Sequence, residues 1–224
     1  MSLRFSVAID GPAGSGKSTI AKRVAKELEL VYIDTGAMYR TVGLYALKNS
    51  IDYKNDTQSL IAKLDDIQID IKYIDGVQNM FLCGENVTGQ IRTEEVGMAA
   101  SGVAVIPEVR LKLVEIQRNM STTTSVIMDG RDIGSYVLPN AEVKIFLTAS
   151  VKERAKRRYD ELIDRGEKPD LEKIERDIEA RDKNDSTREF APLVCVQDAV
   201  KIDTTSMDID QVTAKVLAII NQKI

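Results

Sequence analysis

The chain has 224 residues and a formal net charge of −4, with 31 lysines and arginines, 35 aspartates and glutamates and no histidine. The absence of histidine excludes histidine metal sites, histidine-activated serine or cysteine nucleophiles and histidine general bases. The acidic balance and the lack of tryptophan argue against nucleic acid and an anionic membrane as partners.

The two cysteines and the N-terminal residues indicate in which cellular compartment the protein is expected. Cys83 and Cys195 lie far apart and belong to no CxxC pair, so we expect two reduced, packed thiols rather than a disulfide or a zinc site. Residues 1–5 lack the apolar stretch of a signal peptide, and no run approaches the roughly 18 apolar residues of a membrane span. We therefore expect a cytoplasmic protein.

Five short apolar runs alternate with helical stretches. Runs that are nearly all apolar are typical of strands buried on both faces. Strands that alternate with helices favour a parallel sheet covered by helices on both faces. The predicted fold class is α/β, a three-layer fold with a central five-stranded parallel sheet. The predicted strands are 5–9, 31–33, 126–128, 143–147 and 199–202.

One segment breaks this alternation. Ile67, Ile69 and Ile71 alternate with polar residues, and Asp75-Gly76 is a strong hairpin-turn signal before a returning strand over 77–83. A small antiparallel β insert, an inserted sub-domain at 52–90, is the simplest account. It leaves a core formed by 1–51 and 91–224.

The segment 151–189 predicts a helical hairpin with a charged outer surface. Gly166 and Pro169 interrupt the helical pattern, and Asp170 can cap the second helix. The residues expected to face inward are Ala155, Tyr159, Leu162 and Ile163, then Leu171, Ile174 and Ile178. A last helix from about residue 208 is expected to bury Ile209, Val212, Val216, Leu217 and Ile220.

The glycine-rich stretch after the first strand carries the chemistry. The pattern G-x-x-x-x-G-K-S over 11–18 is a complete phosphate-binding loop. Its glycines let successive amides turn toward an anion, and the following helix adds its positive end. Lys17 can reach the β- and γ-phosphates, and Ser18 can bind the Mg²⁺ that accompanies a nucleotide. The alternative, a structural turn, is disfavoured by the buried strand before it and the amphipathic helix after it.

A second motif ends the strand at 126–128. Asp129 follows three apolar residues, the pattern of a Walker B element, and it can hold a Mg²⁺-bound water. Asp-Gly at 129–130 is also ordinary turn chemistry. Arg131 and Asp132 come next, at the sheet edge where ligands bind in α/β folds. Arg131 can therefore meet a phosphate, and Asp132 can accept hydrogen bonds from a base or a sugar.

Through these motifs, the chain resembles the bacterial cytidylate kinase family, which belongs to the nucleoside monophosphate kinase group of P-loop kinases. The matching segments are 9–19 (IDGPAGSGKST), 34–40 (DTGAMYR), 129–134 (DGRDIG) and the pattern RDxxDxxRxxAPL over 181–193. The resemblance covers essentially the whole chain and implies a P-loop NTPase fold. It also identifies the insert at 52–90 as an NMP-binding sub-domain and the hairpin at about 151–188 as a lid.

The resemblance implies a role for each matching residue. Arg40, Arg131 and Arg188 would hold the acceptor phosphate. The residues implied to read the cytosine edge are Ser101, Arg110 and Asp132, with Thr35 and Tyr39 lining that pocket. Arg181 and Asp185 would meet the ribose. Without the resemblance, Tyr39 could be plain core and Ser101 could serve helix packing.

On the ATP side, the expected binding residues run from Gly11 through Pro12, Ala13, Gly14, Ser15, Gly16, Lys17 and Ser18 to Thr19. The stretch Arg154–Arg158 would begin a mobile lid over ATP, with Arg157 as an ATP-binding residue. The alternative for at least half of the lid arginines is a solvated helix face with pairs inside the helix. Lys17, Asp129, Arg131, Arg181 and Arg188 are the expected catalytic residues, and Ser18 and Asp129 the expected metal site.

The predicted function is an ATP-dependent phosphotransferase that converts CMP or dCMP into CDP or dCDP, with Mg²⁺ as the cofactor. The predicted partners are ATP and CMP or dCMP, with no nucleic acid and no membrane, and the chain is expected to be a monomer. One alternative is another P-loop small-molecule kinase, for UMP or a metabolite. The other is a non-catalytic nucleotide-binding module.

Overall fold

The computed structural model describes residues 4–224, so residues 1–3 of the predicted core segment lie outside the described residues. Its contacts group into two compact units. The first unit comprises the chain up to residue 32 together with 124–224, and the second comprises 33–123. The second unit contains the segment 52–90. The bounds proposed for an NMP-binding sub-domain remain a prediction about function.

A five-stranded parallel sheet is present, as predicted, with the strand order β2-β6-β1-β7-β8. β1 lies between β6 and β7, and Ile9 is paired with Asp129 on one side and Ile145 on the other. The strands are β1 (Ser6–Asp10), β2 (Val31–Asp34), β6 (Val126–Gly130), β7 (Val143–Thr148) and β8 (Val200–Asp203). This order places the ends of β1 and β6 next to each other, and both of the predicted motifs follow those ends.

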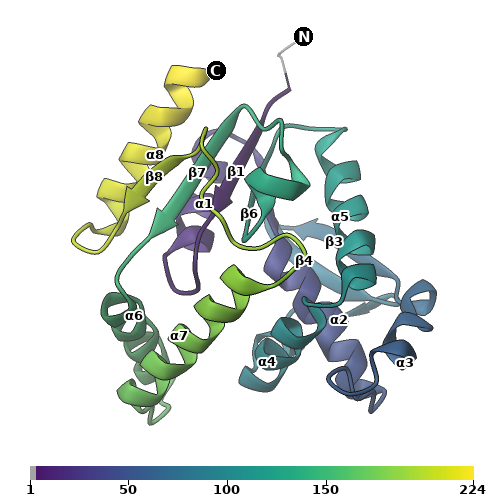
Figure 1. Cartoon of the computed structure of the whole chain (residues 1–224). Coiled ribbons are helices and arrows are strands. Elements are labelled where there is room, and N and C mark those ends of the chain that lie inside the picture. The colour runs from purple at the N-terminus through teal and green to yellow at the C-terminus, as the bar shows by residue number, and fades with distance from the viewer. Residues whose placement is uncertain (1–3) are drawn as a thin grey trace. The chain divides into compact units, whose positions relative to one another are not determined.

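Two helices of the first unit, α1 (Lys17–Glu27) and α8 (Ile209–Lys223), lie side by side against the sheet (Figure 1). They share one apolar core with the strands, and its helical members include Ile20, Val24, Val212, Val216 and Ile220. Ile209 is 47% exposed, against the prediction that it faces inward. It is the first residue of α8, which Asp208 and Gln211 close with a reciprocal capping box.

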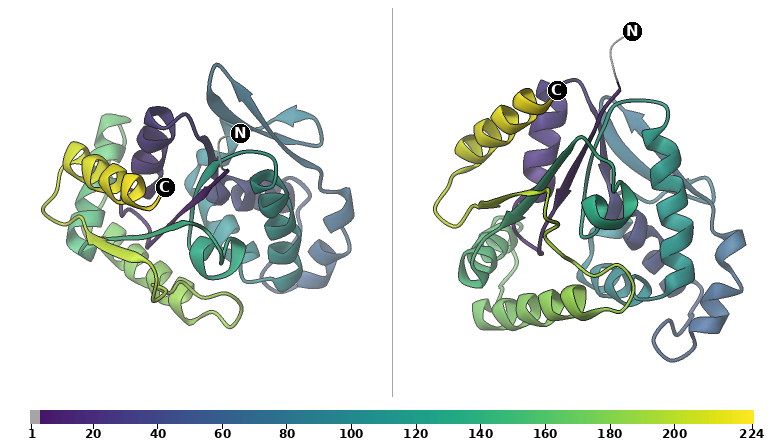
Figure 2. Two further views of the ribbon diagram at one scale, coloured as in Figure 1. Left: turned by 90° about the horizontal axis from the view of Figure 1, so that it is seen from above. Right: turned by 45° about the horizontal axis from the view of Figure 1, so that its top comes forward.

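The predicted helical hairpin is α6 (Val151–Asp164) and α7 (Leu171–Thr187), which run beside each other (Figure 2). The Ser150 side chain caps α6 and that of Asp170 caps α7. Ala155 and Ile178 are buried as predicted, but Ile163 and Leu171 are 46% and 40% exposed. Both exposed residues flank the connecting turn, where the sequence is mostly charged and offers few apolar partners.

In the second unit, the predicted hairpin is present within a three-stranded antiparallel sheet, β3-β4-β5. Asp75 and Gly76 form its turn with φ of 51° and 74°, the left-handed conformation that tight hairpin turns need. The sequence did not indicate the two-residue strand β5. The strands are β3 (Ile69–Ile74), β4 (Val77–Leu82) and β5 (Glu85–Asn86).

The helices of the second unit enclose a second apolar core, which includes Met38, Leu60, Ile67, Ile91 and Leu113. A Cβ atom at Gly43 would lie 2.8 Å from the backbone nitrogen of Ala100, so glycine allows α2 and α4 to pack closely. The helices are α2 (Thr35–Lys48), α3 (Thr57–Ile61), α4 (Glu94–Val103) and α5 (Pro107–Ser121), with short turns η1 (Leu64–Asp66) and η2 (Gln90–Arg92).

The prediction of packed thiols is wrong. Cys83 and Cys195 are free, but both are exposed, because Cys83 occupies the turn after β4 and Cys195 lies in the loop after α7. Such connecting segments run over the surface. Among the described residues, no helix combines the length and apolar character needed to cross a bilayer.

Candidate active site

The phosphate-binding loop joins β1 to α1, as the motif predicts. Gly11, Gly14 and Gly16 have φ of 148°, 72° and 89°, values that favour glycine. Gly11 also has no room for a side chain, since a Cβ atom there would lie 1.9 Å from the carbonyl oxygen of Leu147. Gly16 directly precedes α1. The loop therefore presents backbone amides and a helix N-terminus in the arrangement that binds phosphate.

Lys17 is buried at the start of α1 and points back over the loop. Its Nζ donates hydrogen bonds to the carbonyl oxygen of Pro12 at 2.7 Å and to Ser15 Oγ at 3.4 Å. Burial, together with the positive charge of Arg131, lowers the pKa of the Lys17 amine well below its ordinary value of 10.5. A bound phosphate would supply the missing negative charge and favour the protonated amine.

Asp129 is buried at the end of β6 and faces the first turn of α1. Ser18 Oγ donates to Asp129 Oδ2 at 2.7 Å, and the Tyr32 hydroxyl donates to Asp129 Oδ1 at 2.8 Å. The sequence did not single out Tyr32, which orients the carboxylate from β2. No group of three or more acidic or sulfur side chains forms a metal site among the described residues. A hydroxyl and a carboxylate at 2.7 Å nevertheless fit Mg²⁺, which takes few protein ligands beside phosphates and water.

Arginines and carboxylates alternate in a cluster formed by Arg131, Asp132, Asp185 and Arg188. Arg131 Nε donates to Asp185 Oδ2 at 2.6 Å, and Arg188 Nη2 lies 3.4 Å from Asp132 Oδ1. Burial opposes the ionisation of Asp185, but the positive charge and hydrogen bond of Arg131 hold the pKa of that carboxyl below its ordinary value. The cluster thus brings together four residues that were predicted to bind the acceptor.

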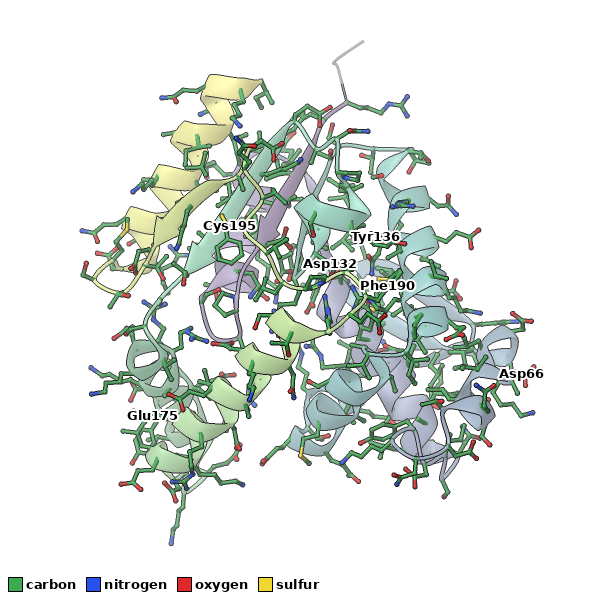
Figure 3. The ribbon with its side chains drawn as sticks, in the orientation of Figure 1. Asp66, Asp132, Tyr136, Glu175, Phe190 and Cys195 are labelled. Carbon is green, nitrogen blue, oxygen red and sulfur yellow. The ribbon has the colours of Figure 1, made fainter. Side chains whose placement is uncertain are left out.

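Arg188 is held from the chain that follows α7. Its Nε donates to the carbonyl oxygen of Ala191 at 2.7 Å, and Ala191 has a φ of 48°, an uncommon value for a residue with a side chain. The Tyr136 and Phe190 rings meet edge to face at 5.0 Å beside Asp132 (Figure 3). The carbonyl oxygen that orients the Arg188 guanidinium thus belongs to a residue in the left-handed conformation.

In the second unit, Arg40 lies on α2, six residues after the capping residue Asp34. Asp34 caps α2 by accepting from the Ala37 amide at 2.9 Å, and its other oxygen accepts from Arg40 Nη2 at 2.9 Å. Arg40 Nε is buried and has no hydrogen-bond partner among the described residues. Thr35, the first residue of α2, directly follows Asp34 and is buried. The Arg40 guanidinium thus keeps donor capacity for a further acceptor.

Arg110 is the largest fully buried side chain in the described part of the protein. Its guanidinium lies over the Tyr39 ring at 5.4 Å, and Nη1 donates to the carbonyl oxygen of Ala104 at 3.1 Å. Tyr39 therefore supports Arg110, and it also packs against the apolar core of the second unit. Ser101, on α4, is partly buried and its hydroxyl bonds to the Gly97 carbonyl at 3.3 Å.

The lid arginines differ from one another in the structure. Arg154 is 3% exposed, and its guanidinium donates to Asp182 at 2.6 Å and to the carbonyl oxygen of Ala13 at 3.0 Å. It joins α6, α7 and the phosphate-binding loop, which no local pattern indicated. Arg157 is bound to Glu153 and to Thr204, at 3.0 Å and 2.7 Å.

Arg158 and Arg165 both pair with Glu161 on the surface of α6. These intrahelical pairs match the alternative reading of the lid arginines as a solvated face. Arg181 lies on α7 and is exposed. Its positive charge acts on Lys17 and on Asp185.

The predicted residues therefore divide between the two units. The first unit holds the phosphate-binding loop, Asp129 and the arginine–carboxylate cluster. The second holds Thr35, Tyr39, Arg40, Ser101 and Arg110. Sequence reasoning missed Asp10 and Tyr32, and it placed Arg154 in the lid without its hydrogen bonds to Asp182 and Ala13. The sequence could have indicated Asp10, since it lies between a buried strand and Gly11. A single Tyr within a strand pattern, or a single Arg within a helical pattern, does not by itself indicate a contact with the site.

Comparison with known proteins agrees with the expected family. The family model described as cytidylate kinase matches residues 7–222. A cytidylate kinase of Caldicellulosiruptor bescii is 53% identical over 96% of this chain and 94% of its own length. One of Geobacillus thermodenitrificans is 51% identical over the whole of both chains.

A solved structure of an uncharacterised Eubacterium ventriosum protein has the same fold, with a TM-score of 0.53 and 14% identity over 97% of this chain and 99% of that one. At this identity the likeness concerns the fold alone. The family model and the curated relatives span nearly every residue, and the resemblance found in the sequence is confirmed. The chain belongs to the cytidylate kinase family.

Proposed function

We propose that the protein transfers the γ-phosphoryl group of ATP to CMP or dCMP and releases ADP with CDP or dCDP. The observation that carries this proposal is the match to cytidylate kinases over essentially the whole chain. The geometry supports it, because a phosphate-binding loop and a separate set of arginines suit a reaction with two anionic substrates. Phosphoryl transfer depends mostly on positioning and on neutralising charge, which the loop amides, Lys17 and the arginines supply.

The donor side is proposed to consist of the loop from Gly11 to Thr19, with Arg157 contributing from the lid. Lys17 would neutralise the β- and γ-phosphates, and its buried amine favours an anion beside it. Ser18 and Asp129 would hold Mg²⁺, directly and through a water. When bound there, the ion supplies positive charge to the phosphates.

The acceptor side is proposed to use the guanidinium groups of several arginines. Arg40, Arg131 and Arg188 would bind the phosphate of CMP, and Arg181 and Asp185 would meet its ribose. Arg110 and Ser101 would donate to the cytosine ring, and Asp132 would accept from its amino group, with Thr35 and Tyr39 beside them. Cytosine offers one donor and two acceptors on that edge, so a site that reads it needs both kinds of group.

The hairpin of α6 and α7 is proposed to close over ATP. Closure would exclude water, which otherwise competes with CMP for the phosphoryl group. Arg154 ties this hairpin to the loop through Ala13, so movement of the hairpin and the shape of the loop are connected.

The test is ADP release with ATP and Mg²⁺ in the presence of CMP, dCMP, UMP, AMP or shikimate. We expect CMP and dCMP to stimulate release far above the others. Equal turnover with UMP or shikimate would indicate another small-molecule kinase. ATP binding without any acceptor-stimulated release would indicate a non-catalytic module. Sedimentation analysis with and without nucleotides tests the further prediction that the protein is a monomer.

A further inference from the structure

Asp10 is the last residue of β1 and directly precedes the phosphate-binding loop. Its carboxylate is buried and accepts two hydrogen bonds from one distant segment. Oδ1 accepts from the Ile133 amide at 2.8 Å, and Oδ2 accepts from the Gly134 amide at 2.7 Å. Short hydrogen bonds from backbone amides to a carboxylate are among the stronger ones in proteins.

The two amides belong to the segment that carries proposed acceptor residues. Ile133 and Gly134 open the π-helical turn η3 (Ile133–Val137), directly after Arg131 and Asp132. The preceding residue provides no side-chain cap for this turn. The first amides of a helical turn have no partner inside it. Asp10 supplies that partner from a strand more than a hundred residues earlier in the chain.

The ionised form of Asp10 is destabilised by burial at this position. Burial raises the pKa of Asp10 to about 6, even though both amides and the positive charge of Lys17 favour its ionised form. The charge of Asp132 acts in the same direction as burial. An asparagine has the same shape but only one acceptor oxygen, so it could satisfy only one of the two amides. The requirement for two acceptors explains why a carboxylate occupies this place.

We propose that Asp10 is a positioning residue for the acceptor, which fixes the backbone of 132–134 and thereby the directions of Arg131 and Asp132. The inference rests on the acceptor roles that the proposed function gives to those two residues. Asp10 precedes Gly11, so one side chain sets the acceptor segment relative to the strand that carries the phosphate-binding loop. Asp10 need not touch either substrate.

The test is Asp10→Asn, with steady-state constants for CMP and for ATP. Loss of a charge-assisted hydrogen bond predicts a fall of about ten- to a hundredfold in kcat/KM for CMP. The KM for ATP should change less than about threefold, since the loop's own hydrogen bonds remain. If Asp10 only stabilised the fold, the variant would impair the use of CMP and of ATP to the same extent. An equal loss for CMP and ATP would overturn the proposal.

Gly134→Ala disturbs the same contact without removing the carboxylate, and it carries the test if Asp10→Asn does not fold. The added methyl would lie 3.3 Å from Asp10 Oδ2 and 3.2 Å from Lys144 Cδ. We expect the same split between CMP and ATP, with a smaller amplitude. In the wild type, the amide protons of Ile133 and Gly134 should resonate downfield, and both variants should shift them upfield. Unmoved amide signals in a folded variant would overturn the proposal.

Glu142→Gln is the matched control. Glu142 also accepts two hydrogen bonds from β1, from the Ser6 amide at 2.7 Å and its hydroxyl at 3.0 Å, but at the opposite end of the strand. It should leave both substrate constants unchanged.

Arg131→Lys separates this inference from the function on which it rests. An unchanged kcat/KM for CMP in Arg131→Lys would overturn the acceptor role of Arg131. A large loss in Arg131→Lys, with none in Asp10→Asn or Gly134→Ala, would overturn the role of Asp10 alone.

Discussion

The phosphate-binding loop and the arginine–carboxylate cluster both face anions in the proposed reaction, but they are built differently. The loop relies on backbone conformation, which Gly11, Gly14 and Gly16 make possible within six consecutive residues. The cluster relies on side chains from two segments more than fifty residues apart, and each guanidinium already has a carboxylate partner. A site built from backbone fails when its conformation is changed, whereas a site built from paired side chains fails when one member is removed.

The largest expected effect comes from Gly11→Ala, which tests whether the loop depends on backbone. A Cβ atom at Gly11 would overlap the Leu147 carbonyl oxygen at 1.9 Å. We expect the free energy of unfolding to fall by about 4 kcal/mol or more, as measured by urea denaturation. Gly89→Ala is the control, because Gly89 has a φ of −73° and open space around it. Equal stability of the two variants would contradict a backbone-built site.

Arg188→Ala tests the cluster. Removing the guanidinium leaves the buried carboxylate of Asp132 and the partly buried carboxylate of Asp185 with fewer positive partners, a change that typically costs about 2–5 kcal/mol. We expect kcat/KM for CMP to fall about thirtyfold or more, while the Kd for ATP, measured by calorimetry, stays nearly constant. Arg176→Ala, a change at an exposed position of α7, should have no effect. Parallel losses for ATP and CMP would show that the cluster does not serve the acceptor alone.

Arg110→Met tests whether Arg110 gives the site its preference for cytosine. Arg110 is supported by a backbone carbonyl and by the Tyr39 ring. We expect the preference for CMP over UMP to shrink about tenfold, the range of one good base contact. The ratio of kcat/KM for the two acceptors measures it. Arg118→Met changes an exposed arginine of the same helix and should keep the preference. The same loss with both acceptors would argue against base reading.

Asp10 lies where the two regions meet, and its ionisation predicts a pH dependence of stability. The groups that act on it are Lys17, Asp132 and the two backbone amides, with the Lys144 chain packed at Gly134. Its pKa is raised from 3.8 to about 6, so the folded state binds the proton more tightly than the unfolded chain. The stability that this group contributes is present below the unfolded pKa and is lost as pH rises through the folded one.

We therefore expect the unfolding free energy of the wild type, relative to Asp10→Asn, to fall by about 2–3 kcal/mol between about pH 4 and pH 6.5. Urea denaturation of both proteins across this range measures the difference. A constant difference would mean that Asp10 titrates normally.

The smallest effect is expected at the exposed ion pairs of α6. Glu161→Gln removes the partner of both Arg158 and Arg165, whose side chains are 37% and 43% exposed. Exposed pairs contribute about 0–1 kcal/mol and are screened by salt. Thermal unfolding at low and high salt should show a small loss that disappears at high salt. A loss as large as that of Arg188→Ala would remove the contrast between buried and exposed arginines.

Much of the fold could be predicted from the sequence because the patterns that indicate it are local. The five strands, the turn at Asp75-Gly76 and the cap at Asp170 each depend on a few adjacent residues, and the structure has them all. The sequence was a poorer guide to which side chains at the ends of helices are buried. Ile209 and Leu171 continue an apolar stripe in the sequence, but each begins a helix, where the neighbouring chain leaves it exposed.

The candidate site shows the same division. The sequence by itself determined the phosphate-binding loop, Lys17 and the acidic end of β6, because their chemistry needs only a contiguous pattern at a strand end. Only the tertiary structure decided that Asp10 accepts from Ile133 and Gly134 and that Arg154 reaches Ala13. Those hydrogen bonds join residues more than a hundred positions apart. Their partners are set by which strands and helices become neighbours, and no local pattern encodes that choice.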